Sequence, residues 1–148
     1  MWPEWERALA SELNSKVLVV EDERHIARFL EFVLQKEGFS VDCAFDGDAA
    51  EQKIQANTYS AILLDLGLPH RSGLEVLSLI RSLVVPSRPA VIVLTAKSSG
   101  DVLNQVLAAG ADAHCPKPVA PSTLLKKLKE LGVTSGDRTT VPVGFGDN

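Results

Sequence analysis

The sequence predicts an α/β fold with a doubly wound parallel sheet, from two patterns that run along most of the chain. Short apolar runs alternate with longer segments in which apolar residues recur at helical spacing. Strands that alternate with helices indicate βαβ units, and right-handed crossovers on both faces then make the sheet doubly wound. The length of 148 residues fits one domain, since a chain of this size buries roughly 70% of its unfolded surface.

Five segments are predicted strands, and three of them are continuous runs rich in Val, Ile or Leu. Such runs are typical of parallel strands covered on both faces, and they are the first, third and fourth of the set. The second alternates in polarity and suits an edge strand, while the fifth is short and is assigned mainly by its place in the order. The five are KVLVV (16–20), FSVDCA (39–44), SAILLD (60–65), AVIVLT (90–95) and DAHC (112–115).

Five helices are predicted between and after these strands, each from an apolar stripe that we expect to pack into the core. Gly38, Gly110 and Gly132 stand just past three of them, where glycine commonly ends a helix. Pro121 stands at the start of the last helix, a position that suits proline. The predicted helices cover 24–37, 47–56, 73–83, 99–109 and 121–131.

The two ends of the chain depart from this pattern. Residues 1–15 are predicted to form an N-terminal helical extension, residues 16–132 the folded domain, and residues 133–148, rich in Gly, Thr, Pro and Ser, a flexible tail. The first residues include acids where a signal peptide would be basic, so we expect a cytoplasmic protein.

Charge and composition argue against several partners. The net charge of -4 and the sequence pI of about 5.3 argue against direct binding of nucleic acid. No run approaches the roughly 18 apolar residues of a membrane span. Cys43 and Cys115 lack CxxC spacing, and their strands are expected at opposite edges of the sheet, so we predict free thiols and no disulfide.

Three acids follow or end two of the predicted strands. Glu21 and Asp22 follow the first strand, and Asp65 ends the third. Doubly wound sheets bind ligands where the strand order reverses, which for the order 2-1-3-4-5 lies between these two strands. Carboxylates about 5 Å apart repel by about 3 kcal/mol at an effective dielectric near 20. Such a cluster raises a pKa or takes up a cation, and oxygen ligands with room for phosphate suit Mg²⁺.

Two further polar residues are predicted at the same edge. Thr95 ends the fourth strand and Lys117 follows the fifth. Alone, Thr95 is more often an ordinary strand-end residue, Lys117 a surface lysine, and EDER (21–24) a solvated loop that caps the next helix. Together they place a hydroxyl and an ammonium beside acids that can hold a metal, which is what phosphoryl transfer requires.

With these residues in this order, residues 16–131 resemble the receiver domain of response regulators, the CheY-like module of two-component signalling. The resemblance is carried by VLVVEDE, LLDLGLP followed by Gly73, VLTA, AAGADA and KP. It implies a flavodoxin/CheY-like sheet of five parallel strands in the order 2-1-3-4-5.

The resemblance also implies a role for each site residue. Asp65 would accept a phosphoryl group from a histidine kinase or a histidine phosphotransfer protein. Glu21, Asp22 and Asp65 would bind Mg²⁺, together with the backbone carbonyl of Gly67. Lys117 would pair with a phosphoryl oxygen, and its bond to the following proline would be cis.

The switch is where the sequence departs from the family pattern. The resemblance implies that Thr95 moves toward the phosphoryl group. His114 stands where the family usually has the Tyr or Phe that follows this movement. Imidazole is smaller than those rings and can titrate. The alternative is an edge-strand histidine at the surface. Gly67, two residues after Asp65, has no side chain that could shield the phosphoryl group from water.

We therefore expect a phosphorylation-dependent switch that signals by protein–protein interaction. Its enzymatic activity would not go beyond self-phosphotransfer and autodephosphorylation. The output face would be formed by helices 99–109 and 121–131 with strand 112–115, contacting a downstream protein or a second copy of the chain. No direct contact with nucleic acid or membrane is expected.

Several alternatives remain open on the sequence. One is a receiver-like binding module that signals without phosphorylation, and another is a receiver excised from a larger regulator. A phosphatase of the haloacid dehalogenase type would need a second Asp where Gly67 stands. A flavin or nucleotide binder would need Gly, Ser or Thr amides after the first strand, where EDE would repel phosphate.

Overall fold

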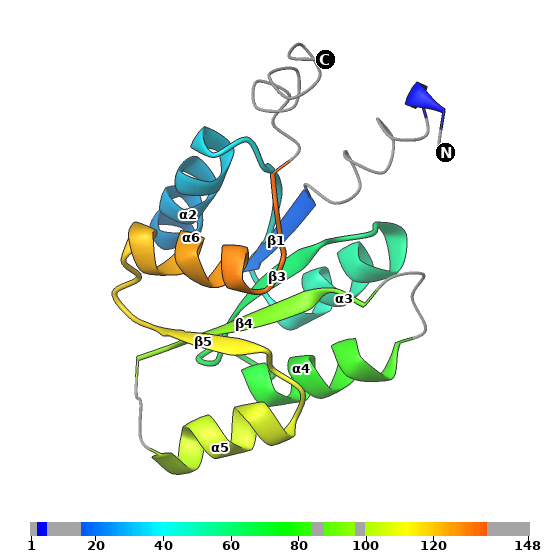
Figure 1. The fold of residues 1–148 in the computed structure, drawn as a ribbon. Coiled ribbons are helices and arrows are strands. Elements are labelled where there is room, and N and C mark those ends of the chain that lie inside the picture. Colours follow the sequence, from blue (N-terminus) through cyan, green and yellow to red (C-terminus); the bar gives the residue numbers. More distant parts are fainter. Residues whose placement is uncertain (1–2, 6–15, 84–87, 97–99, 136–148) are drawn as a thin grey trace.

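The computed structural model describes residues 3–5, 16–83, 88–96 and 100–135. Strands and helices alternate from β1 to α6 (Figure 1). The strands are β1 (Lys16–Val20), β2 (Ser40–Ala44), β3 (Ala61–Asp65), β4 (Ala90–Thr95) and β5 (Ala113–Pro116). The helices are α2 (Arg24–Lys36), α3 (Gly47–Ala56), α4 (Gly73–Ser82), α5 (Gly100–Ala108) and α6 (Pro121–Glu130).

The five strands form one parallel sheet in the order β2-β1-β3-β4-β5. This confirms the predicted fold class and strand order. β3 lies at the centre, and all five of its residues are buried. Between β1 and β3 the order changes direction, which places the ends of these two strands at the edge where such sheets bind ligands.

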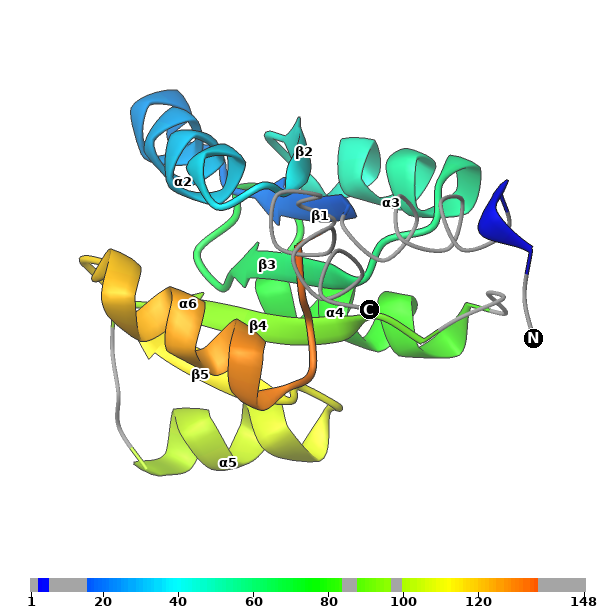
Figure 2. The same ribbon diagram turned by 45° about the horizontal axis from the view of Figure 1, so that its top comes forward.

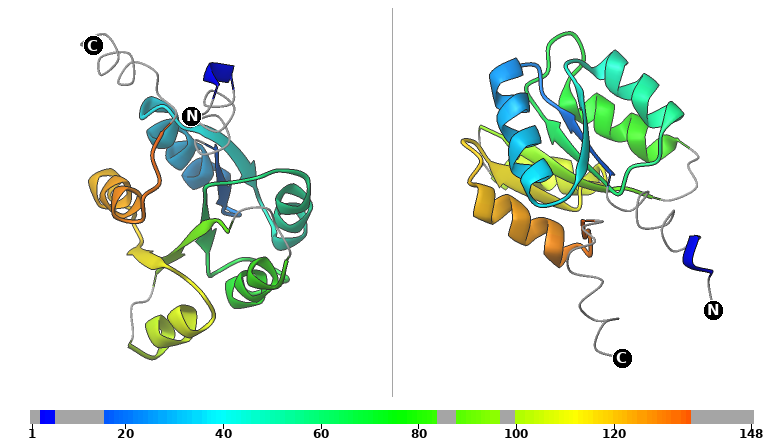
Figure 3. Two further views of the ribbon diagram at one scale, coloured as in Figure 1. Left: turned by 45° about the vertical axis from the view of Figure 1, so that its right-hand side comes forward. Right: turned by 90° about the horizontal axis from the view of Figure 1, so that it is seen from above.

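Helices cover both faces of the sheet (Figures 2 and 3). α2 and α6 lie on one face, and α3, α4 and α5 on the other. Alternate residues of β1 divide between the two cores: Val17 and Val19 pack toward α2 and α6, whereas Leu18 and Val20 pack toward the other three helices. Because both faces are covered, the central strands are apolar, and the polar side chains of these strands lie at their ends.

The predicted boundaries differ from the observed ones by about one residue. β2 begins at Ser40 because the amide of Phe39 donates instead to the carbonyl of Leu34 (3.1 Å) and closes the end of α2. The glycines after α2, α5 and α6 all have positive φ, from 77° to 111°. This conformation is easily reached by glycine, so the stop signals in the sequence were correctly interpreted.

The remaining expectations concern the cysteines and the chain ends. Cys43 and Cys115 are free and lie on opposite edge strands, as predicted; Cys115 is buried and Cys43 half-buried. Most of the predicted N-terminal extension and C-terminal tail lies outside the described residues. Val133, however, is described and packs into the core beside α2 and α6. None of the described helices has the length and hydropathy to cross a membrane.

Candidate functional site

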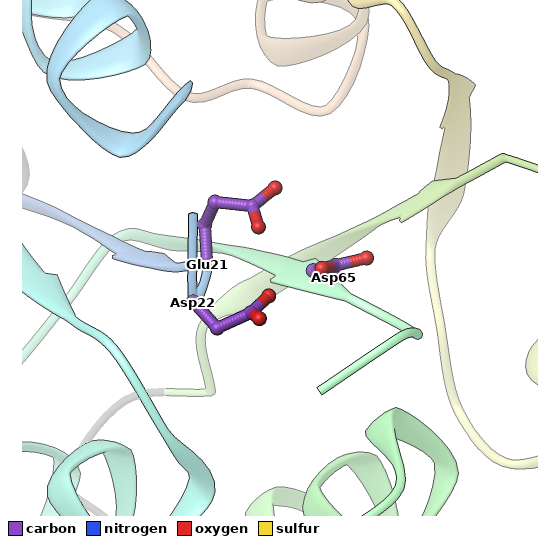
Figure 4. Close-up of side chains that lie close together, drawn as sticks. All are labelled: Glu21, Asp22 and Asp65. Carbon is purple, nitrogen blue, oxygen red and sulfur yellow. The ribbon is translucent and has the colours of Figure 1, made fainter. Parts of the chain in front are cut away.

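Three carboxylates meet where β1 and β3 end. Glu21 and Asp22 follow β1, and Asp65 is the last residue of β3 (Figure 4). One carboxylate oxygen from each lies within 4.8 Å of the others. The parallel register pairs Val20 with Leu64, which brings the next residues of both strands side by side. Glu21 is fully buried and Asp65 is 4% exposed, whereas Asp22 is half-buried.

Lys117, which directly follows β5, brings a positive charge to this cluster. Its Nζ lies 2.7 Å from Glu21 Oε1 and 3.2 Å from Asp65 Oδ2. Burial lowers the pKa of Lys117, but the two carboxylates outweigh burial and raise it overall. The backbone N–H of Lys117 donates to the carbonyl of Thr95 (2.9 Å), and the Lys117–Pro118 bond is cis, as the resemblance implied.

Burial disfavours the charged form of Glu21. Burial raises its pKa to about 7, against the opposing effects of Lys117 and of the Glu23 N–H, which donates to Oε2 (3.2 Å). Its other oxygen, Oε1, has no well-aligned hydrogen bond among the described residues and depends on the Lys117 ammonium. The cluster holds three carboxylates and one ammonium, which contacts two of them, so oxygen ligands outnumber the positive charge. An all-oxygen donor set of this charge fits Mg²⁺.

Asp65 is held on three sides. Its Oδ1 accepts a hydrogen bond from the Gly67 N–H (3.0 Å), and its Oδ2 faces Lys117. The next residue, Leu66, continues the pairing of β3 with β4 by donating to the Leu94 carbonyl (3.1 Å). The carboxylate is therefore fixed in position at the strand end, beside the oxygens that can hold a metal.

The other candidate residues lie on the two neighbouring strands. Thr95 is buried at the end of β4. His114 is half-buried on β5, and it is paired with Val93 in the register of the two strands. Thr95 thus reaches the edge of the sheet that carries the acids, while His114 lies further down its strand.

We predict a pH dependence of stability from the buried Glu21. Without divalent cations, the folded state holds the Glu21 proton up to pH of about 7, whereas the unfolded state releases it near 4.5. Unfolding therefore releases a proton between these values, and raising the pH through this window destabilises the fold by about 3 kcal/mol. The measurement is the free energy of unfolding in EDTA against pH, for the parent protein and Glu21→Gln.

The comparison with Glu21→Gln separates the contribution of Glu21 to the pH dependence of stability from that of the other carboxylates. The stability of the parent relative to the variant should fall as the pH rises from 4.5 to 7, and excess Mg²⁺ should reduce that fall. A difference that stays constant across this range would contradict the prediction.

Comparisons with known proteins agree on one family. A family model, the response regulator receiver domain, matches residues 17–129. Response regulator ArlR of Staphylococcus saprophyticus is 40% identical over 119 residues, which are 79% of this chain and 52% of that protein. Transcriptional regulatory protein CutR of Streptomyces coelicolor is 42% identical over 130 residues, 86% of this chain and 56% of that protein. The chain thus spans about half the length of the curated relatives it matches.

Solved structures show the same relationship. Chemotaxis protein CheY4 of Vibrio cholerae superposes with a TM-score of 0.75 at 31% identity, over 78% of this chain and 97% of that one. The receiver domain of the Francisella response regulator 1452 gives a TM-score of 0.73 at 30% identity, over 79% and 95%. The chain belongs to the response regulator receiver domain family.

Proposed function

We propose that Asp65 accepts a phosphoryl group from a histidine kinase or a histidine phosphotransfer protein. The observation that carries the proposal is the combination at one strand end of a fixed carboxylate, an ammonium 3.2 Å away and two further carboxylates. These supply a nucleophile, a cation for the phosphoryl oxygens and donors for a metal. Phosphoryl transfer depends mainly on such positioning and charge stabilisation.

In the proposed transfer, a carboxylate oxygen of Asp65 forms a bond to phosphorus. The bond from phosphorus to the imidazole nitrogen of the donor histidine breaks, and the imidazole keeps that electron pair. Lys117 pairs with a phosphoryl oxygen. Glu21, Asp22, Asp65 and the Gly67 carbonyl would hold Mg²⁺, which would neutralise charge on the phosphoryl oxygens.

We also propose that Thr95 and His114 transmit the change. Thr95 would turn toward the phosphoryl group. His114, on the adjacent strand, would then change its side-chain position, because the movement of Thr95 changes the space beside it. The output face would comprise α5, β5 and α6, which would contact a downstream protein or a second copy of the chain. His114 would act there in place of a larger aromatic ring.

The wider role is a proposal of the same kind. We propose a receiver that acts in the cytoplasm and controls a protein partner or a further segment of a longer regulator. The relative CutR is named a transcriptional regulatory protein, which supports an output in gene control. The net charge of -4 supports a receiver that does not itself contact nucleic acid.

Intact-mass spectrometry after incubation with acetyl phosphate and Mg²⁺ tests the phosphoacceptor. We expect the parent protein to gain one phosphoryl group, and Asp65→Asn to gain none, because an amide is not a competent nucleophile here. Asp112→Asn is a matched control, since Asp112 directly precedes β5, at the end of the sheet away from the acid cluster, and pairs with Arg81. No Mg²⁺-dependent mass gain in the parent would favour the alternative, a binding module that signals without phosphorylation.

A further inference from the structure

The loop between β3 and α4, residues 66–72, carries an arginine that the proposed transfer does not use. Arg71 Nη1 lies 3.0 Å from Asp48 Oδ1 and 3.0 Å from Glu51 Oε1, both on α3. The stem of Arg71 also packs over Gly47, the first residue of α3, where a Cβ would lie 3.2 Å from Arg71 Cδ. One side chain thus joins the loop to the start of α3 by charge and by packing.

The same loop contains a backbone conformation that non-glycine residues rarely adopt. His70 has φ of 66°, and the Arg71 N–H donates to the Pro69 carbonyl at 2.7 Å. Together these make a γ-turn centred on His70, and a γ-turn with positive φ is strained. Such conformations persist where the surrounding structure holds them. The ion pairs of the next residue, Arg71, supply contacts of this kind.

The loop is connected directly to the acid cluster. At its start, the Gly67 N–H donates to Asp65 Oδ1 (3.0 Å). At its end, the Gly73 N–H donates back to the Leu66 carbonyl (3.2 Å). Between these two points, the buried side chain of Leu68 and the ion pairs of Arg71 attach the loop to the rest of the domain. The ion pairs of Arg71 are therefore among the contacts that fix the loop on which Gly67 lies.

We propose that Arg71 is a positioning residue for the magnesium site. By pairing with Asp48 and Glu51, it holds the loop in the strained conformation in which the Gly67 carbonyl would bind the metal. The inference rests on the proposed metal site and adds a residue that is not itself a ligand.

The sign of the effect separates positioning from simple electrostatics. Removing a positive charge near a cation site would, by charge alone, strengthen Mg²⁺ binding. Losing a residue that orients a ligand weakens binding instead. Arg71→Met removes the charge and keeps much of the apolar stem that covers Gly47, so the two effects predict opposite results for the same variant.

Isothermal titration calorimetry of the full chain with Mg²⁺ makes this test. We expect Arg71→Met to bind Mg²⁺ about three- to tenfold more weakly than the parent, at or below the roughly tenfold lower limit typical of residues that contact metal ligands directly. Arg71→Lys, which keeps the charge, should lose less. Arg88→Met is the matched control: it removes a cation that pairs with Asp112 at the opposite edge of the sheet, and should leave the affinity unchanged.

A second variant addresses the strained turn. His70→Gly relieves the cost of positive φ, so in the Arg71→Met background it should restore most of the lost affinity.

The free energy of unfolding is measured alongside, because a merely structural role would lower stability without changing Mg²⁺ affinity. Affinity in Arg71→Met equal to or above that of the parent would overturn the inference and leave the metal site intact. No Mg²⁺ binding by the parent would overturn both.

Discussion

Replacing Lys117 with Met is expected to lower the free energy of unfolding by about 3 kcal/mol at pH 8 in the absence of Mg²⁺. The ammonium lies 2.7 Å from Glu21 Oε1, and Glu21 is fully buried. Without Lys117, which lowers the Glu21 pKa, that pKa rises further, so the folded state at pH 8 must either take up a proton or bury the carboxylate without its counter-ion, and the repulsion from Asp65 is no longer offset. Urea denaturation followed by circular dichroism measures the loss.

Mg²⁺ should distinguish this cause from a general loss of packing. The variant presents the same three carboxylates without the competing ammonium, so Mg²⁺ should bind it more tightly and restore more stability than in the parent. Lys129→Met is the matched control, since Lys129 is exposed near the end of α6 and should change stability little. Equal stabilisation of parent and Lys117→Met by Mg²⁺ would contradict the role given to Lys117.

Replacing Gly73 with Ala is expected to destabilise the fold by about 3 kcal/mol and to weaken Mg²⁺ binding. A Cβ on Gly73 would lie 2.5 Å from Leu66 Cα and 2.7 Å from the Asp65 carbonyl oxygen. Both are backbone atoms, so the methyl group can be accommodated only if the end of β3 and the start of α4 move apart. That movement would displace the Asp65 carboxylate from its neighbours.

Gly100→Ala provides the control for Gly73→Ala. Gly100 is also the first residue of a helix, α5, but a Cβ there meets nothing within 4 Å. Its substitution should leave Mg²⁺ binding unchanged and, by restricting the unfolded chain, hold or slightly raise stability. Unfolding and Mg²⁺ titrations on both variants give the comparison. The same response from both would mean that crowding at Leu66 does not control the site.

Much of the fold and the acid cluster could be predicted because both follow from local patterns. Continuous apolar runs identify strands buried on both faces, and residues after parallel strands share one edge of the sheet. Glu21, Asp22 and Asp65 meet for that reason alone. The ends of α2, α5 and α6 were signalled by glycines whose positive φ the structure confirms.

The contacts between distant side chains could not be predicted in this way. Lys117 was expected near the acids, but its close contact with Glu21 depends on how a half-buried lysine after β5 packs against a buried glutamate after β1. Arg81 gives no local signal either, although it binds the carbonyls of Gly110 and Pro89 and the carboxylate of Asp112. The roles of Thr95 and His114 stay predictions, since they concern a movement between two states.

The left-handed conformation of His70 had a weaker signal still. Glycine is the residue that most often marks such a position, and histidine, although enriched there among the other residue types, is only a weak signal. The strain is evident only from the φ of His70 in the folded loop, which the ion pairs of Arg71 help to hold in place.

Locating the phosphoryl group on the chain tests the central claim most directly. An acyl phosphate is reduced by borohydride, whereas an unmodified carboxylate is not, so phosphorylated aspartate is converted to homoserine at its own position. After treatment with acetyl phosphate and Mg²⁺, we expect peptide mass spectrometry to find homoserine at position 65 and nowhere else, and to find none when EDTA is present. Homoserine at another acid, or an unmodified Asp65 in a protein that binds Mg²⁺, would contradict the account.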